Sequence, residues 1–222
     1  VLTPIQILLS DLEDILHGVQ LIRECTRRTQ DLVLSLGVRA SCLLVSEYLR
    51  HRGIENRILE ETGIVLARGL RGEERIDYPR SYEAIRRHLS GNLLPLVPGG
   101  IAATDQATAT VLRRDGCDLT ASLVAAALKA ESVELWTDSD GVMSADPAYV
   151  REAFVVPELS YQEAMELSYF GARLVHAQAL VPPMELDIPV CVRNLNDPAR
   201  PGTLICRSPR RAERTIAGIA SI

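Results

Sequence analysis

The sequence has little of several residue types that mark particular classes of protein. Lys129 is the only lysine among 24 basic residues, so a mechanism that needs an active-site ammonium must use Lys129 or import one. The five cysteines form no Cys-x-x-Cys pair, which argues against a zinc site or a disulfide framework. No apolar run approaches the roughly 20 residues that a membrane helix needs. No Gly-x-x-x-x-Gly-Lys-Ser/Thr loop is present, which excludes a P-loop enzyme.

The net charge and the opening residues of the sequence indicate which binding partners and which cellular compartment to expect. A net charge of −5 argues against general nucleic-acid binding. A basic cluster near the end of the chain is typical of a solvated connector (Arg207, Arg210, Arg211 and Arg214). The opening residues lack the basic region and cleavage site of a signal peptide. With the scattered cysteines, this predicts a cytoplasmic protein with no nucleic-acid and no membrane partner.

Helical and strand patterns alternate along the chain, and several strand-like runs are apolar at every position. This pattern is typical of a mostly parallel sheet with both faces covered. It predicts an α/β protein with a three-layer α/β/α arrangement. Ser10 with Glu13, and Ser160 with Glu163, form two capping boxes that predict helix starts. Gly53 is expected to end a helix over residues 29–52.

A first candidate site lies at residues 113–118, where a strand is expected to lead into an alanine-rich helix. Gly116 allows close approach of the backbone, and the helix N–H groups favour an anion. Arg114 can hold a carboxylate or phosphate with two hydrogen bonds. Asp118 can cap the helix, accept from a substrate ammonium, or do both. The alternative is a plain turn with a capping aspartate.

A second candidate site follows the apolar run of Val133, Leu135 and Trp136. The sequence Thr137-Asp138-Ser139-Asp140-Gly141 places two carboxylates and a glycine turn at the carboxyl end of an expected buried strand. Open α/β sheets bind ligands at that position. Thr137 and Asp138 could hydrogen-bond a nucleotide, or the aspartates could cap the turn themselves.

A third candidate is Arg173, which follows Gly171 in an expected helix where a cation could reach phosphates. The alternative is a solvent-facing arginine. His176 could face the same way, although a lone histidine more often has a structural role.

The order and spacing of these sites resemble the amino-acid kinase superfamily, and their detail resembles aspartate kinase. The similar stretches are Asp11-Leu-Glu-Asp-Ile-Leu-His-Gly-Val, Leu34-Ser-Leu-Gly-Val-Arg, Trp136-Thr-Asp-Ser-Asp-Gly-Val-Met, Glu158-Leu-Ser-Tyr-Gln-Glu-Ala-Met-Glu-Leu-Ser-Tyr-Phe-Gly-Ala and Pro201-Gly-Thr-Leu-Ile. The resemblance implies an amino-acid kinase-like fold. It also implies transfer of the γ-phosphoryl group of ATP, with Mg²⁺, to the side-chain carboxylate of L-aspartate, the entry step to lysine, threonine and methionine.

The same resemblance implies roles for individual residues. Arg114 and Asp118 would be catalytic, and they would bind aspartate together with Arg39 and Cys117. The implied nucleotide contacts are Thr137, Asp138, Asp140, Gly141, Met143 and Arg173. Residues 1–206 would form the catalytic domain without its first phosphate-loop strand (Lys-Phe-Gly-Gly-Thr). Residues 207–222 would be a linker and the start of a regulatory ACT-like module, through which the full-length protein would form homo-oligomers.

Several positions depart from the family pattern. Val38 replaces a glutamate, Gly100 a phenylalanine, Asp115 a glycine and Cys117 a serine, while Ala148 and Arg173 replace an arginine and a lysine. Loss of one charge-stabilising donor can lower a rate by about 10²–10³-fold. The alternative function is therefore a degenerate homologue that binds or regulates. A third is another amino-acid kinase, acting on glutamate or a nucleoside monophosphate.

Overall fold

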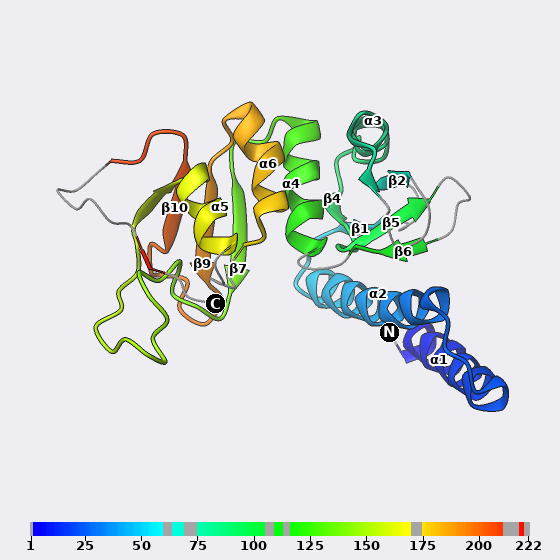
Figure 1. Cartoon of the computed structure of the whole chain (residues 1–222). Helices are drawn as coiled ribbons and strands as arrows, with labels where there is room; N and C mark the ends of the chain where they lie inside the picture. Colours follow the sequence, from blue (N-terminus) through cyan, green and yellow to red (C-terminus); the bar gives the residue numbers. More distant parts are fainter. Residues whose placement is uncertain are drawn as a thin grey trace. The chain divides into compact units, whose positions relative to one another are not determined.

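The computed structural model describes residues 2–59, 64–68, 75–104, 109–112, 116–169, 175–210 and 218–219. The chain divides into two compact units, Val1–Cys117 and Asp118–Ile222, which are described separately below and shown in Figure 1. The expected catalytic domain over 1–206 and the ACT-like segment over 207–222 stay predictions. Most of that segment lies outside the described residues.

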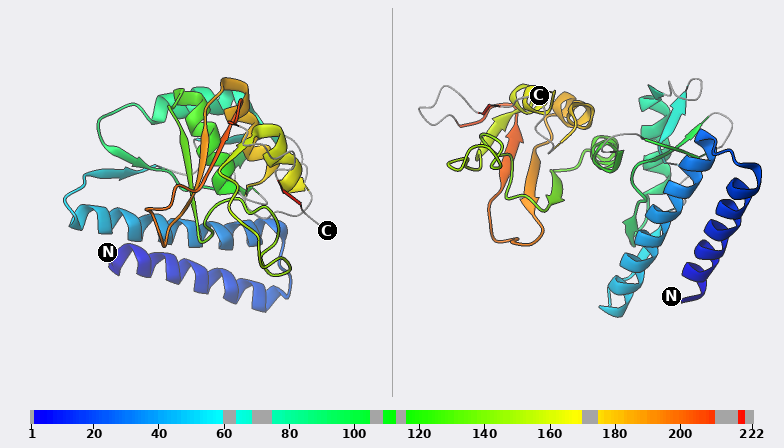
Figure 2. Two further views of the ribbon diagram at one scale, coloured as in Figure 1. Left: turned by 90° about the vertical axis from the view of Figure 1, so that its left-hand side faces the viewer. Right: turned by 60° about the horizontal axis from the view of Figure 1, so that its bottom comes forward.

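Unit 1 begins with two long helices that pack against each other, α1 (Leu2–Ile22) and α2 (Arg27–His51), as Figure 2 shows. Thr26 caps α2, because its hydroxyl accepts the Thr29 N–H at 3.2 Å. Gly53 follows the end of α2 with φ +77°, which confirms the predicted stop. The predicted capping box at Ser10 is wrong, because α1 starts eight residues earlier at Leu2 and runs through it.

The strands of unit 1 form two sheets among the described residues. One has the order β3 (Arg75–Ile76), β2 (Leu66–Arg68), β5 (Ile101–Thr104), β6 (Ala109–Val111), with β2 parallel to β5 and the outer pairs antiparallel. The other pairs β1 (Asn56–Ile58) with β4 (Leu94–Leu96) in parallel. The core of the unit includes Ile101, Ala102 and Ala103 of β5.

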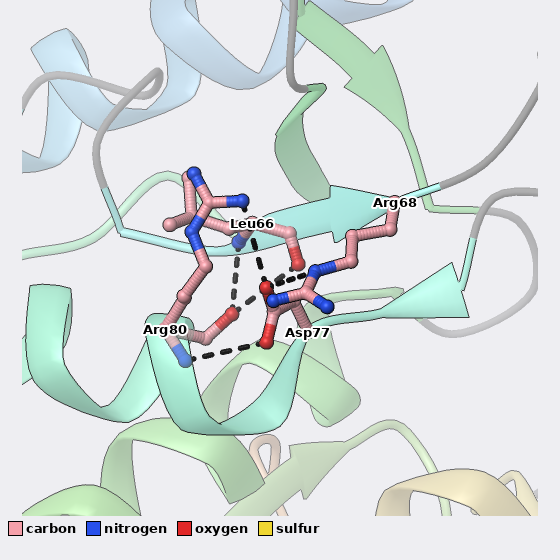
Figure 3. Close-up of polar contacts among 5 residues, drawn as sticks. Leu66, Arg68, Asp77 and Arg80 are labelled. Atoms are coloured by element: carbon pink, nitrogen blue, oxygen red, sulfur yellow. Dashed lines mark hydrogen bonds and ion pairs between the residues drawn. The ribbon is translucent and has the colours of Figure 1, made fainter.

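The buried carboxylate of Asp77 joins β2 to the helix α3 (Tyr78–His88), as Figure 3 shows. It caps α3 by accepting the Arg80 N–H at 3.4 Å. It also pairs with the guanidinium groups of Arg68 at 2.5 Å and Arg80 at 3.6 Å. One turn along, the Ser81 hydroxyl accepts the Leu66 N–H at 2.9 Å. These contacts fix the start of α3 against the strand.

By length and composition alone, α2 is apolar enough to cross a membrane, whereas no membrane helix was expected from the sequence. The same helix buries polar side chains against other parts of unit 1. Asp31 accepts the Thr110 hydroxyl of β6 at 3.1 Å, and Ser46 donates to Asn56 of β1 at 2.6 Å. One helix of this kind is weak evidence for a membrane span.

Unit 2 contains a four-stranded sheet in the order β7 (Val133–Thr137), β9 (Val190–Asn194), β10 (Thr203–Cys206), β8 (Glu158–Ser160). Pairs β7–β9 and β8–β10 are parallel, and β9–β10 is antiparallel. The helices are α4 (Gly116–Leu128, which starts at the end of unit 1), α5 (Tyr161–Tyr169) and α6 (Ala177–Leu186). Leu159, Leu180, Val190, Val192 and Ile205 form much of the core.

The second predicted capping box is confirmed at the start of α5. The Ser160 hydroxyl accepts the Glu163 N–H at 3.2 Å, and the Glu163 carboxylate accepts the Ser160 N–H at 2.8 Å. Both units combine helices with strands, and parallel strand pairs occur in each. The predicted α/β class is therefore confirmed, with antiparallel neighbours added at β3, β6 and between β9 and β10.

Candidate functional site

The acidic turn, residues 137–141, lies at the carboxyl end of β7 in unit 2. Val133 and Leu135 are buried, while Glu134 and Trp136 face solvent, as the alternation of a strand requires. The parallel register pairs Thr137 with Asn194, so that β7 and β9 end side by side. This is the carboxyl-end edge of a parallel strand pair, where α/β proteins bind ligands.

The first half of the acidic turn presents polar groups to solvent. The Thr137 hydroxyl donates to the Asp138 carboxylate at 3.2 Å and accepts the Ser139 N–H at 3.4 Å. The Thr137 carbonyl accepts the Leu195 N–H at 2.7 Å, which ties the turn to the segment after β9. Asp138 is exposed. Its carboxylate is therefore accessible to a ligand while the backbone beneath it is held.

Asp140, the second carboxylate of the turn, is half-buried and is bound by the last residue of β9 and by the segment that joins β9 to β10. Asn194 donates its side-chain N–H to one carboxylate oxygen at 2.6 Å. Arg200 pairs with the other oxygen and also with Asp197 at 3.0 Å. Both oxygens of Asp140 are thus occupied by side chains of this chain.

Gly141 closes the turn where the backbone passes very near Thr203. Its φ is +144°, and a Cβ there would lie 2.7 Å from the Thr203 hydroxyl and 2.8 Å from Val155. The fully buried Thr203 hydroxyl accepts the Val142 N–H at 2.8 Å and donates to the Val156 carbonyl at 2.7 Å. Met143 then forms a β-bridge with Val155. Only glycine fits the turn without displacing these groups.

The start of α4 carries two predicted substrate residues, an exposed Cys117 and a half-buried Asp118, in the first helical turn. The backbone of the loop 98–100, which precedes β5, passes close to the first residues of this helix. A Cβ on Gly116 would lie 2.8 Å from the Gly100 Cα atom, and one on Gly99 would lie 3.0 Å from the Cys117 Sγ atom. Within unit 1, the small residues therefore bring the loop 98–100 close to Gly116 and Cys117, the first two residues of α4. The N–H groups at the start of a helix favour an anion.

The structure brings some of the predicted residues together and leaves others aside. Thr137, Asp138, Asp140 and Gly141 share one turn, with Met143 just beyond it, whereas Cys117 and Asp118 share the start of α4. Arg39 lies half-buried on α2, in unit 1. Arg114, Asp115 and Arg173 lie outside the described residues. His176 caps α6 by accepting the Gln178 N–H at 3.3 Å, which is a structural role.

Three residues that hold the acidic turn were missed in the sequence analysis: Asn194, Arg200 and Thr203. Asn194 had a usable signal, because it is a polar residue at the end of a second apolar strand, one position after Arg193. The carboxyl ends of parallel strands meet at one edge. Arg200 and Thr203 gave no local signal, since their contacts depend on the path of the β9–β10 connection.

Within the described residues, no group of three or more His, Cys, Asp or Glu side chains could hold a metal ion. Burial shifts the pKa of Cys191 and of Tyr161, which lie away from the turn. Burial raises the pKa of the Cys191 thiol on β9, and the Glu134 carboxylate adds to the rise. Burial also raises the pKa of Tyr161 to about 12, and Asp187 adds to that rise.

The fold and the acidic turn agree with one protein family. The sequence profile of the amino acid kinase family matches residues 9–194, which is most of the chain. The chain therefore belongs to the amino acid kinase family.

Within that family, the chain is similar to aspartokinases. It is 35% identical over 219 residues to aspartokinase 3 of Arabidopsis thaliana, covering 95% of this chain and 39% of the relative. It is 38% identical over 200 residues to the bifunctional aspartokinase/homoserine dehydrogenase of Daucus carota, covering 88% of this chain and 22% of the relative. Both relatives are described as chloroplastic. The chain thus spans between about a fifth and two fifths of these relatives.

Solved structures give the same picture. The structure of E. coli aspartokinase III in complex with aspartate and ADP matches with a TM-score of 0.87 and 30% identity, over 94% of this chain and 47% of that one. UMP kinase from Bacillus anthracis, at 14% identity and a TM-score of 0.53, shares the fold alone. The predicted amino-acid kinase fold and the resemblance to an aspartate kinase catalytic domain are confirmed.

Proposed function

We propose that this chain is the catalytic domain of an aspartate kinase, which transfers the γ-phosphoryl group of ATP to the side-chain carboxylate of L-aspartate. The observation that carries the proposal is the acidic turn. Its backbone is fixed by Thr203 and the segment after β9, while the Asp138 carboxylate faces solvent. A fixed backbone with accessible polar groups meets the general requirement that a binding site be preorganised. The proposed phosphoryl acceptor is taken from a relative, because E. coli aspartokinase III was solved in complex with aspartate and ADP.

The proposal gives different tasks to the two groups of residues. Thr137 and Asp138 would hydrogen-bond the nucleotide, and Met143, two residues after the turn, would contact it as well. Asp118 would accept from the ammonium of aspartate at the start of α4. Arg39 would contribute to aspartate binding from α2. Arg114 and Arg173 keep their predicted roles at the substrate carboxylate and the phosphates.

Mg²⁺ belongs to the proposal as a companion of ATP. In kinases this ion is usually held by one or two carboxylates together with the nucleotide phosphates, so a dedicated protein cluster is not required. The exposed carboxylate of Asp138 fits one such contact. When bound, the ion would neutralise charge on the transferring phosphoryl group.

The second candidate function is a homologue that binds ligands without catalysis. Ala148 favours it, because this exposed residue offers no side-chain donor to a phosphate where the family has an arginine. Val38 and Asp115 were also expected to weaken the substrate side. Phosphoryl transfer depends mostly on positioning and charge stabilisation. The replacements at these three positions would therefore lower the rate of transfer.

One assay separates the two functions. The protein expressed from its complete reading frame is incubated with ATP, Mg²⁺, aspartate and hydroxylamine, which traps aspartyl phosphate as a hydroxamate. Aspartate-dependent hydroxamate supports the kinase. Its absence, with aspartate and ADP still bound in calorimetry, supports the binding homologue.

The role of Asp118 is tested on the same protein. Asp118→Asn is expected to weaken aspartate binding at least tenfold, since a charged hydrogen-bond partner contributes about 1.5–3 kcal/mol, and to leave ADP binding within about twofold. Equal losses for both ligands would contradict the assigned role.

Compartment and assembly stay part of the proposal. We expect a cytoplasmic protein that forms homo-oligomers through a downstream ACT-like module, although the plant relatives are chloroplastic. Light scattering on the protein from the complete reading frame, with and without residues beyond 206, tests the assembly.

A further inference from the structure

We propose that Asp140 is a positioning residue of the acidic turn, held by Arg200 and Asn194, and that Arg200 tunes nucleotide affinity by neutralising this carboxylate. The inference rests on the proposed nucleotide site and deepens it. Asp138 then contacts the nucleotide, whereas Asp140 is bound by side chains of the protein. The resemblance to aspartate kinase had implied nucleotide contacts for both carboxylates.

The hydrogen bonds of Asp140 support this division. Asn194 occupies one oxygen at 2.6 Å and Arg200 occupies the other. Asn194 is itself fixed, because its side-chain oxygen accepts the Asn196 N–H at 2.7 Å. The side chain of Asp140 is 34% exposed, whereas Asp138 is exposed and accepts from the neighbouring Thr137 hydroxyl. A ligand would have to displace two partners to reach Asp140 and would meet Asp138 directly.

The last residue of β9 and the segment after it therefore hold the acidic turn at two points. The Leu195 N–H binds the Thr137 carbonyl at the start of the turn. Arg200 and Asn194 bind Asp140 near its end. The guanidinium of Arg200 is also oriented by Asp197 at 3.0 Å, and a planar guanidinium bound to two carboxylates has few alternative positions. The segment 194–200 acts as a clamp on the turn.

The ion pair between Arg200 and Asp140 affects nucleotide affinity through its charge. Asp138 and Asp140 stand two residues apart, and a nucleotide brings further negative charge. Pairing with Arg200 cancels one of the two carboxylates, so that phosphates meet less repulsion. The Arg200 side chain is 53% exposed, so the effect is modest and weakens as salt increases.

The test measures ADP binding by calorimetry on the chain and its variants. Arg200→Ala is expected to weaken ADP binding about threefold to fivefold at low salt, the range of a half-exposed ion pair, and less at high salt. Arg207→Ala is the matched control, because it removes a similar ion pair with Asp187 elsewhere in unit 2, and it should leave ADP binding within about twofold.

A second substitution separates positioning from direct contact. Asp140→Asn in the Arg200→Ala background removes the unpaired carboxylate and keeps an oxygen for Asn194. The double variant should therefore bind ADP more tightly than Arg200→Ala alone. A further loss in the double variant would show that Asp140 contacts the nucleotide, and it would overturn the inference.

Hydrogen exchange in the free protein tests the clamp independently of the proposed nucleotide binding. In the free protein, Arg200→Ala should speed exchange of the amides of residues 139–141 while Arg207→Ala does not. Unchanged exchange and unchanged ADP affinity in Arg200→Ala would overturn the clamp alone. No ADP binding by the unsubstituted chain would overturn the nucleotide site and this inference with it.

Discussion

Gly141→Ala tests how tightly the acidic turn is built. The new Cβ would lie 2.7 Å from the Thr203 hydroxyl and 2.8 Å from the Val155 side chain, at a φ of +144°. Thr203 cannot move away without losing its bonds to Val142 and Val156. Overpacking costs about 1–3 kcal/mol, and an unfavourable backbone conformation adds about 1–3 kcal/mol. The expected loss of unfolding free energy in unit 2 is therefore about 3 kcal/mol.

Urea unfolding followed by tryptophan fluorescence measures this loss. Trp136 is the only tryptophan, it lies on β7 next to the turn, and Arg193 stacks over its ring at 5.3 Å. The signal therefore reports on unit 2. With a urea slope of about 1–3 kcal/mol per M, the midpoint should fall by about 1–3 M.

Gly18→Ala is the control for this substitution. Gly18 lies inside α1 in unit 1, where an added Cβ meets nothing within 4 Å. Alanine is favoured over glycine inside a helix, so the fluorescence midpoint should not fall. An unchanged midpoint for Gly141→Ala would refute the proposed packing of the turn.

Two other predictions concern buried polar groups. Asp77→Ala removes the cap of α3 and the partner of Arg68 and Arg80, so it should destabilise unit 1 by about 2 kcal/mol. Chemical unfolding followed by circular dichroism measures this loss. A loss no larger than that of Glu83→Ala, which breaks an exposed ion pair with Arg87, would contradict the prediction. Tyr161 has a folded pKa raised to about 12 from 10.0, so its stabilising effect is complete below pH 10 and is lost between about pH 10 and 12. Tyrosinate absorbance should show a late-titrating step that Tyr161→Phe removes, and a step already complete near pH 10 would contradict the burial of this ring.

The sequence predicted those features that depend on neighbouring residues. Ser160 and Glu163 form the expected capping box because both partners lie within one helical turn. Thr137–Gly141 lie at the end of a strand because apolar alternation stops there. Ser10 carried the same local signal and was misread, since α1 already begins at Leu2 and packing on α2 decides its extent.

The rest depends on contacts between distant segments. Asn194 and Arg200 lie more than fifty residues after Asp140, and only the parallel pairing of β7 with β9 brings them to it. The antiparallel pairing of β9 with β10 likewise places Thr203 beneath Gly141. Residue types alone could indicate the ligand side of the turn, but not the side chains that support it.

The central claim is that the acidic turn binds a nucleotide through Asp138. Titration of the chain with ADP and Mg²⁺, followed through Trp136 fluorescence, tests it most directly. Saturable binding is predicted for the chain and for the control Glu185→Gln, which changes an exposed carboxylate on α6, and a loss of at least fivefold is predicted for Asp138→Asn. Equal ADP affinity in Asp138→Asn and Glu185→Gln would contradict the claim.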